Sequence, residues 1–164
     1  MATCPHLTPN TGGWHAFNVG MLMAQLQVLE FSARVTLQLR AGTPPIENLL
    51  ALKRGEWVAV TPMTNYDQLG AVLEKFNEGA SSRYRLDVPR IVELRDQLAH
   101  GRTAATNPFP LTLLKFGKPV KGKVPVLARI DMTEAWFVQQ RAFIQKALDA
   151  VIDEQMDWHR RRQG

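Results

Sequence analysis

The sequence predicts an all-α protein: an up-down helical bundle with long first and last helices and a small β-hairpin, at about residues 111–130, before the last helix. Two observations predict this class. Apolar residues recur at helical spacing through residues 14–40 and again through residues 136–152. Between them, from Pro108, the period changes to two short apolar runs, which is typical of a hairpin.

The length and composition suit one compact domain. The chain has 164 residues, 45% hydrophobic and 21% charged, which excludes a chain that is disordered throughout. No repeat or linker divides it, so we expect a single domain over residues 1–164. Residues 1–11 should form an N-terminal arm, and residues 159–164 should form a basic C-terminal tail.

The first helix should cover residues 14–40, and Gly42 with Pro44 should end it. Its apolar residues occupy more than one face, so we expect it to be central or to lie at a subunit contact. The segment 46–63 is open to two interpretations, a short helix or a short extended piece. Trp57 within it is either a core aromatic or an exposed stacking surface.

Capping patterns predict the starts of the later helices. Thr64 and Asp67 have the spacing of a capping box, followed by an amphipathic helix to about Glu78. Asp87 as N-cap with a proline in the first turn opens a third helix, which Gly101 should end.

The last two elements are the hairpin and the closing helix. The apolar runs 111–116 and 124–130 are separated by a linker rich in glycine and lysine. Asp131 and Glu134 resemble a second capping pair, ahead of a long helix whose buried stripe includes Trp136. Trp14 and Trp136 are expected to be core aromatics.

The charge of the chain is uneven. The formal net charge is +5, and the segment 97–130 contains no acidic residue. A surface of this kind suits a polyanion such as RNA, although a solvated lysine-bearing hairpin has the same composition. The basic residues of this segment are Arg102, Lys115, Lys118, Lys121, Lys123 and Arg129.

A reducing, cytoplasmic location without membrane association is expected. The single cysteine, Cys4, excludes an intramolecular disulfide framework and a multi-cysteine metal site. No secretory signal precedes the first helix. Residues 14–29 lack charge, but the stretch is shorter than the roughly 20 apolar residues that a membrane-spanning helix needs.

The most informative segment is Ile91–Arg102, which reads IVELRDQLAHGR. Arg95 and His100 stand in R-x4-H spacing, Asp96 follows the arginine, and a small residue and a glycine flank the histidine. This pattern resembles the signature of the HEPN superfamily, helical domains whose metal-independent members cleave RNA. The long helices before and after the motif helix are similar to the layout of that family.

The resemblance implies a HEPN-like bundle in which Arg95, Asp96 and His100 are catalytic and no cofactor or metal ion is required. It also implies a toxin or defence role, with an antitoxin or another regulatory protein as partner. The chemistry agrees with RNA cleavage by the 2′-hydroxyl. Histidine titrates near neutral pH and can transfer protons, and arginine can hold phosphate oxygens. Further contacts to RNA are expected from Arg102, Lys115, Lys118, Lys121 and Lys123.

The spacing of the motif raises a geometric problem. Five residues on an ideal helix leave Arg95 and His100 about 140° apart around the axis, whereas Asp96 and His100 share a face and should interact. The arginine and the histidine can meet only if the last helical turn unwinds or if a second copy contributes its own motif. The second option predicts a homodimer in which the motif helices face each other.

Two other hypotheses remain open. A non-catalytic HEPN-like domain would bind RNA or a protein without cleavage. An interaction domain would use the wide apolar stripe of residues 14–39 as a partner surface. In the simplest structural interpretation of the motif, Arg95 pairs with Glu93 or Asp96, and His100 only bonds a terminal carbonyl of its helix.

Overall fold

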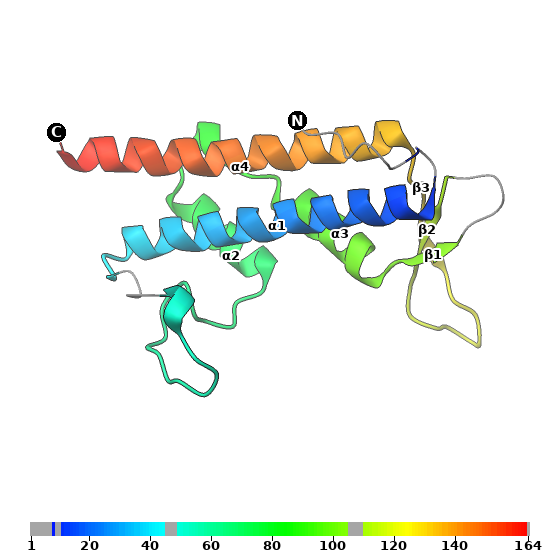
Figure 1. The fold of residues 1–164 in the computed structure, drawn as a ribbon, viewed down its shortest axis with the longest axis horizontal. Coiled ribbons are helices and arrows are strands. Elements are labelled where there is room, and N and C mark those ends of the chain that lie inside the picture. The colour runs from blue at the N-terminus through cyan, green and yellow to red at the C-terminus, as the bar shows by residue number, and fades with distance from the viewer. Residues whose placement is uncertain (1–7, 9–10, 45–48, 105–109, 164) are drawn as a thin grey trace. The chain divides into compact units, whose positions relative to one another are not determined.

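The computed structural model describes residues 8, 11–44, 49–104 and 110–163 (Figure 1). These residues are mostly helical and carry one small antiparallel sheet, so the long first and last helices and the hairpin are confirmed. The α-helices are α1 (Gly12–Arg40), α2 (Leu69–Gly79), α3 (Val88–His100) and α4 (Glu134–Gln163). The strands are β1 (Arg102–Ala104), β2 (Thr112–Phe116) and β3 (Val126–Asp131), and the short 3-10 helices are η1 (Leu49–Ala51) and η2 (Ser82–Tyr84). A HEPN-like bundle stays a prediction.

The chain divides into two compact units. Unit 1 combines residues 1–26 with 90–145, and unit 2 combines residues 27–89 with 146–164. The expectation of a single domain stays a prediction. Most of the expected N-terminal arm lies outside the described residues, and the basic tail is the last part of α4 as far as Gln163. Among the helices of the described residues, none has the length and apolar character to cross a membrane.

The core of unit 1 lies between the sheet and the parts of α1 and α4 in that unit. Leu22 of α1, Leu113 of β2 and Phe137 of α4 are buried in one cluster. Trp14 and Trp136, the expected core aromatics, meet Phe137 edge-on with ring centroids 5.4 Å and 4.9 Å away. Such T-shaped pairs add stability beyond burial alone. The cluster holds the sheet at the N-terminal end of α1 (Figure 1).

The sheet has the strand order β1-β2-β3, with β2 paired antiparallel to both neighbours. The pairing of β2 with β3 confirms the predicted hairpin. The sequence does not predict β1, because all three of its residues are exposed and none is a large apolar residue. This strand forms because the chain leaves α3 beside β2.

The start of α2 differs from the prediction. The helix begins at Leu69, several residues after the expected capping box. Thr64 Oγ1 instead donates to the carbonyl of Ala59 over 2.7 Å, and the carboxylate of Asp67 accepts a bond from Lys75 Nζ over 2.6 Å. The predicted box is therefore wrong, because both of its side chains bind loop or surface groups.

The cap of α4 is also different. Thr133 Oγ1 accepts a hydrogen bond from the backbone N–H of Trp136 over 3.2 Å, so the threonine is the N-cap and Glu134 is the first helical residue. Asp131, the predicted cap, lies at the end of β3 and accepts a bond from Thr112 Oγ1 over 2.7 Å. The predicted pair Asp131 and Glu134 is therefore wrong.

In unit 2, one buried arginine fixes an irregular segment. Residues 52–68 contain no helix or strand. The guanidinium of Arg34 donates to the carbonyls of Pro62 and Asp67 over 2.9 Å and 2.6 Å, and to Asn65 Oδ1 over 2.7 Å. These bonds satisfy polar groups that regular secondary structure would otherwise pair.

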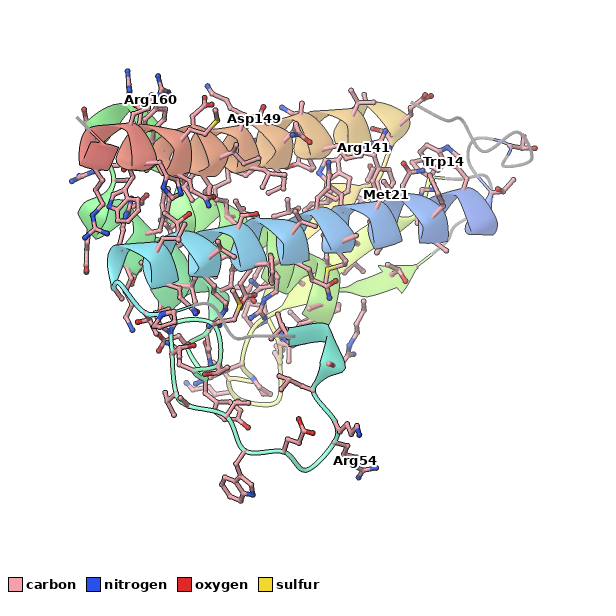
Figure 2. All side chains as sticks on the ribbon, turned by 60° about the vertical axis from the view of Figure 1, so that its left-hand side comes forward. Trp14, Met21, Arg54, Arg141, Asp149 and Arg160 are labelled. Carbon is pink, nitrogen blue, oxygen red and sulfur yellow. The ribbon has the colours of Figure 1, made fainter. Side chains whose placement is uncertain are left out.

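The preceding part of this segment is exposed. Of the short helix considered over residues 46–53, the described residues contain only η1, and no strand forms around Trp57. Trp57 is almost completely exposed, which excludes a core position for it. Figure 2 shows Arg54 at the tip of the same loop.

A buried ion cluster connects α1, α4 and the turn after α2 within unit 2. Glu154 has no exposed surface, and its carboxylate accepts bonds from Arg40 Nη2 over 3.2 Å and from Arg161 Nη2 over 2.7 Å. The backbone N–H and the hydroxyl of Ser81 also donate to it. Burial alone raises the pKa of Glu154, but the hydrogen bonds from Arg161 and Ser81 and the charge of Arg161 outweigh it and hold that pKa below its ordinary value.

Candidate functional site

The candidate site is built on α3, which begins at Val88, directly after the expected N-cap Asp87. Val88, Ile91 and Leu94 are buried, so one face of the helix is fixed by packing. The polar motif residues follow on the outer part of the helix. The position of the motif therefore depends on ordinary core packing of the first two turns.

The end of α3 is fixed by a close contact with the sheet. The backbone N–H of Gly101 donates to the carbonyl of Gln97 over 2.8 Å, which continues the helical bonding past His100. A Cβ atom at position 101 would lie 2.8 Å from Leu113 Cδ2 and would also collide with the carbonyl oxygen of Gln97. The predicted end of the helix at Gly101 is confirmed, and the close contacts explain why this position is a glycine.

Arg95 and Asp96 form an ion pair. Arg95 Nη1 lies 2.9 Å from Asp96 Oδ1, and both side chains are partly exposed. This pairing is the one that the simplest structural interpretation expected. The sequence also led us to expect that Asp96 interacts with His100, but among the described residues the carboxylate of Asp96 bonds only to the arginine. Asp96 therefore orients Arg95 in this structure.

His100 is the last residue of α3 and is exposed. In the part of the chain that the structure describes, its imidazole has no hydrogen bond or ion pair. The alternative in which His100 bonds a terminal carbonyl is therefore not observed. The imidazole is free to meet a ligand or a second protein.

The two motif residues do not converge within one chain. Because α3 stays regular through His100 and the N–H of Gly101 continues its bonding, the last turn does not unwind. Arg95 and His100 thus keep the separation of about 140° that five helical residues impose. Of the two ways in which they could meet, only a second copy remains.

The sheet next to the motif carries a cationic face. The register places Arg102 of β1, Leu114 of β2 and Arg129 of β3 opposite one another, so these side chains share one face. Leu113 belongs to the other face, which packs in the core. The Cζ atom of Arg102 lies 5.5 Å from the ring centre of Phe116, a cation–π contact. On the same face, Arg129 Nη2 lies 3.9 Å from Asp131 Oδ1, so the charge of this arginine is partly compensated. We call Arg102, Phe116 and Arg129 the cationic sheet face.

The predicted RNA-contact residues separate into different places. Arg102 lies on the cationic sheet face, but Lys115 shares the face of Leu113 by strand alternation and is half-buried. Lys118, Lys121 and Lys123 are exposed in the loop between β2 and β3. Arg102 is therefore the one predicted contact residue that directly follows the motif and lies on the cationic sheet face. The three loop lysines belong to the connection between β2 and β3.

The tip of that loop is a two-residue turn. Val120 and Lys123 exchange backbone hydrogen bonds of 2.7 Å and 3.0 Å, and Lys121 and Gly122 between them both have positive φ, 49° and 74°. Positive φ at both central positions is typical of a type I′ turn. The turn presents Lys121 at the tip, with Lys118 on the arm before it.

Phe116 and Arg129 were not among the contact residues predicted from the sequence. Arg129 was visible as part of the acid-free segment, but only the strand register shows that it shares a face with Arg102. Phe116 reads as the end of an apolar strand, and its partial exposure beside Arg102 comes from the fold. No sequence signal gives either placement.

Comparisons with known proteins found no relationship: no protein-family model matches the chain, and no curated protein or solved structure is significantly similar to it. No group of three or more His, Cys, Asp or Glu side chains within residues 11–44, 49–104 and 110–163 is arranged to hold a metal ion. The catalytic roles of Arg95, Asp96 and His100 stay predictions.

Proposed function

We propose that the protein is a metal-independent endoribonuclease of HEPN type, in which the motif helices of two copies face each other and form one site. The observation that carries the proposal is the exposed, unbonded imidazole of His100 at the end of a regular helix, followed within two residues by Arg102 on the cationic sheet face. The separation of Arg95 from His100 on α3 is the reason for a second copy.

The reaction needs three groups. The 2′-oxygen of RNA attacks the adjacent phosphorus, the bond to the 5′-oxygen breaks, and a 2′,3′-cyclic phosphate and a free 5′-hydroxyl result. One imidazole accepts the proton of the 2′-hydroxyl, and the imidazole of the other copy donates a proton to the leaving 5′-oxygen. Arg95 stays charged and binds the phosphate oxygens as negative charge develops on them.

The ion pair with Asp96 fits this role of Arg95. The contact between Nη1 and Oδ1 occupies one of the five N–H donors of the guanidinium, so donors remain for two phosphate oxygens. Asp96 is then a positioning residue that holds the guanidinium in one orientation. We expect its replacement to weaken cleavage less than replacement of Arg95.

The cationic sheet face and the loop lysines support a polyanionic substrate. Arg102, Arg129 and the loop lysines are exposed, and six basic residues lie in an acid-free stretch of the chain. Phosphate contacts of this kind release counterions, so we expect binding to weaken steeply with salt. Phe116 adds an aromatic surface beside Arg102, which suits a base of single-stranded RNA.

A second candidate is a non-catalytic RNA-binding domain, which a specific observation favours. Arg95 is already neutralised by Asp96 within its own chain, as it would be on a purely structural helix face. This candidate keeps the same binding surface and removes the reaction. The toxin or defence role and a regulatory partner protein rest on the resemblance alone and remain part of the proposal.

The test is cleavage of RNA in excess chelator by the wild type and by His100→Ala and Arg95→Ala. We expect cyclic-phosphate ends from the wild type and a loss of about 10²-fold or more in both variants. His159→Ala is the matched control, because His159 is another exposed histidine near a helix end. RNA binding without cleavage in all variants would support the second candidate, and neither binding nor cleavage at low salt would overturn both.

A further inference from the structure

One face of α1 is exposed and apolar along most of the helix. Phe17, Met21, Val28 and Phe31 keep 41%, 40%, 48% and 49% of their surface exposed, and Met21 is labelled in Figure 2. At about 100° per residue, these four positions lie within about 60° of Ala24 around the helix axis. Between residues 17 and 31, the remaining exposed positions of the same strip are Gly20, Ala24 and Gln27. We call these seven residues the α1 face.

The α1 face carries no charge. Its only polar member is Gln27, and no charged residue occurs in the whole stretch 14–29. The exposed side of α4, a helix of nearly equal length, has the ordinary mixture and includes Lys146, Asp149 and Arg160. An exposed helix face with large apolar side chains and no charge is typical of an interface.

No contact among the described residues explains why position 20 is a glycine. It lies in the interior of α1, where glycine stabilises a helix less than alanine does. An added Cβ at Gly20 would meet no atom within 4 Å, so none of the described residues requires its small size. Close approach of another molecule's side chain is a physical reason to keep a glycine at an exposed helix position.

The α1 face is complementary to itself. In an antiparallel pair of helices with a two-fold axis at Ala24, each residue faces the one at the same sequence distance on the other side of Ala24. Gly20 then faces Val28 of the other copy, and Phe17 faces Phe31. The side chain of Val28 thus packs against the glycine of the other copy. The two copies of Ala24 contact each other where the helices cross.

We propose that the α1 face binds a second copy of this chain, with the two α1 helices antiparallel about a two-fold axis at Ala24. A second copy fits better than a charged partner, since the face offers no group for an ion pair. The chain has a formal net charge of +5, so two copies repel each other at their basic surfaces but not at this face. The inference goes beyond the proposed function, because it requires neither RNA nor cleavage.

The exposed area sets the expected strength. With roughly 150–200 Å² for each fully exposed side chain of this size, the four large residues expose about 300 Å² per copy. Two copies together would bury about 600 Å² of it, roughly 40% of the 1,600 Å² that a standard interface buries, and the flanking small residues add to this. We therefore expect a weak dimer that forms at high protein concentration and dissociates on dilution.

Cross-linking tests the proposed register. In a Cys4→Ser background, Ala24→Cys places two sulfurs next to each other across the axis, within the reach of a disulfide. We expect mild oxidation to give a covalent dimer of this variant. Ala142→Cys is the matched control, because Ala142 is an exposed alanine in the interior of α4. Equal cross-linking of both variants, or none at residue 24, would overturn the register.

Gly20 provides the second measurement. We expect Gly20→Leu to keep the wild-type helical circular dichroism and to weaken dimer formation at least tenfold in sedimentation experiments, because the added side chain meets Val28 of the other copy. Gly20→Ala should raise the melting temperature of the dilute monomer while it weakens the dimer. A wild type that stays monomeric at high concentration, or a dimer that Gly20→Leu leaves unchanged, would overturn the proposal.

A third cysteine separates this inference from the proposed function. Ala99 is exposed and precedes His100, so Ala99→Cys reports contact between the motif helices. Linkage at residue 99 without linkage at residue 24 would overturn the α1 contact and keep the two-copy site. Linkage at residue 24 together with RNA that is never cut would support the α1 contact and remove the enzyme.

Discussion

Glu154→Gln is expected to destabilise the protein strongly, because the carboxylate is the acceptor at the centre of the buried cluster. Glutamine keeps the size of the side chain but removes the charge opposite Arg40 and Arg161. Breaking a buried pair from one side costs about 3–5 kcal/mol, since the remaining charge is left uncompensated. The glutamine oxygen can still accept from Ser81, so we take the lower end, about 3 kcal/mol.

Urea unfolding measures this loss. With a denaturant slope of about 2 kcal/mol per molar, 3 kcal/mol lowers the midpoint by about 1.5 M. Lys75→Met is the control, because it breaks the half-exposed pair with Asp67 and should move the midpoint far less. A midpoint of Glu154→Gln within error of the control would refute the reasoning that the cluster is buried and intact in solution.

Two further perturbations test unit 1. Gly101→Ala should destabilise the fold by about 2–4 kcal/mol in the same assay, because the methyl group collides with Leu113 and with the helix carbonyl, while Gly12→Ala, which has open space, should be close to neutral. Burial lowers the pKa of His15, so the unfolded chain takes up a proton more readily than the folded chain. Stability should therefore fall as the pH drops below about 6.5, and His15→Gln should flatten that dependence; an unchanged slope would contradict the burial of a neutral imidazole.

The long elements could be predicted because their signal is local. The helical period of residues 12–40 and the change of period before β2 are both readable along the chain. Periodicity did not reveal which apolar side of α1 is buried. Leu22 and Leu29 are in the interior and Phe17 and Phe31 are exposed, although all four are equally apolar in sequence.

Features that depend on distant partners could not be predicted. Glu154 stands in a charged part of α4 and reads as a solvated residue, but Arg40, more than a hundred residues earlier, makes it a buried ion. The predicted N-cap of α4 was wrong for a similar reason. The carboxylate of Asp131 accepts a hydrogen bond from Thr112 of the neighbouring strand, and Thr133 caps α4 instead. Local propensity is overridden where tertiary contacts supply a better partner.

The candidate site also combines local features, which the sequence predicts, with features that depend on distant partners. The pairing of Arg95 with Asp96 is local, and the simplest interpretation of the sequence expected it. The cationic sheet face depends on the register that sets Arg102 opposite Leu114 and Arg129, which becomes visible only when the strands are paired. The separation of Arg95 and His100 follows from helix geometry, and the regular end of α3 removed the alternative of an unwound turn.

The most direct test of the two-copy site is to mix the wild type with an inactive variant. Because the site needs one imidazole from each copy, a dimer of the wild type with His100→Ala should not cleave RNA. After subunit exchange of equal amounts, half of the dimers are mixed and a quarter are wild type, so the cleavage rate should fall to about half of the rate of the same wild-type protein alone. A rate that the variant leaves unchanged, although the two proteins exchange subunits, would contradict the two-copy site.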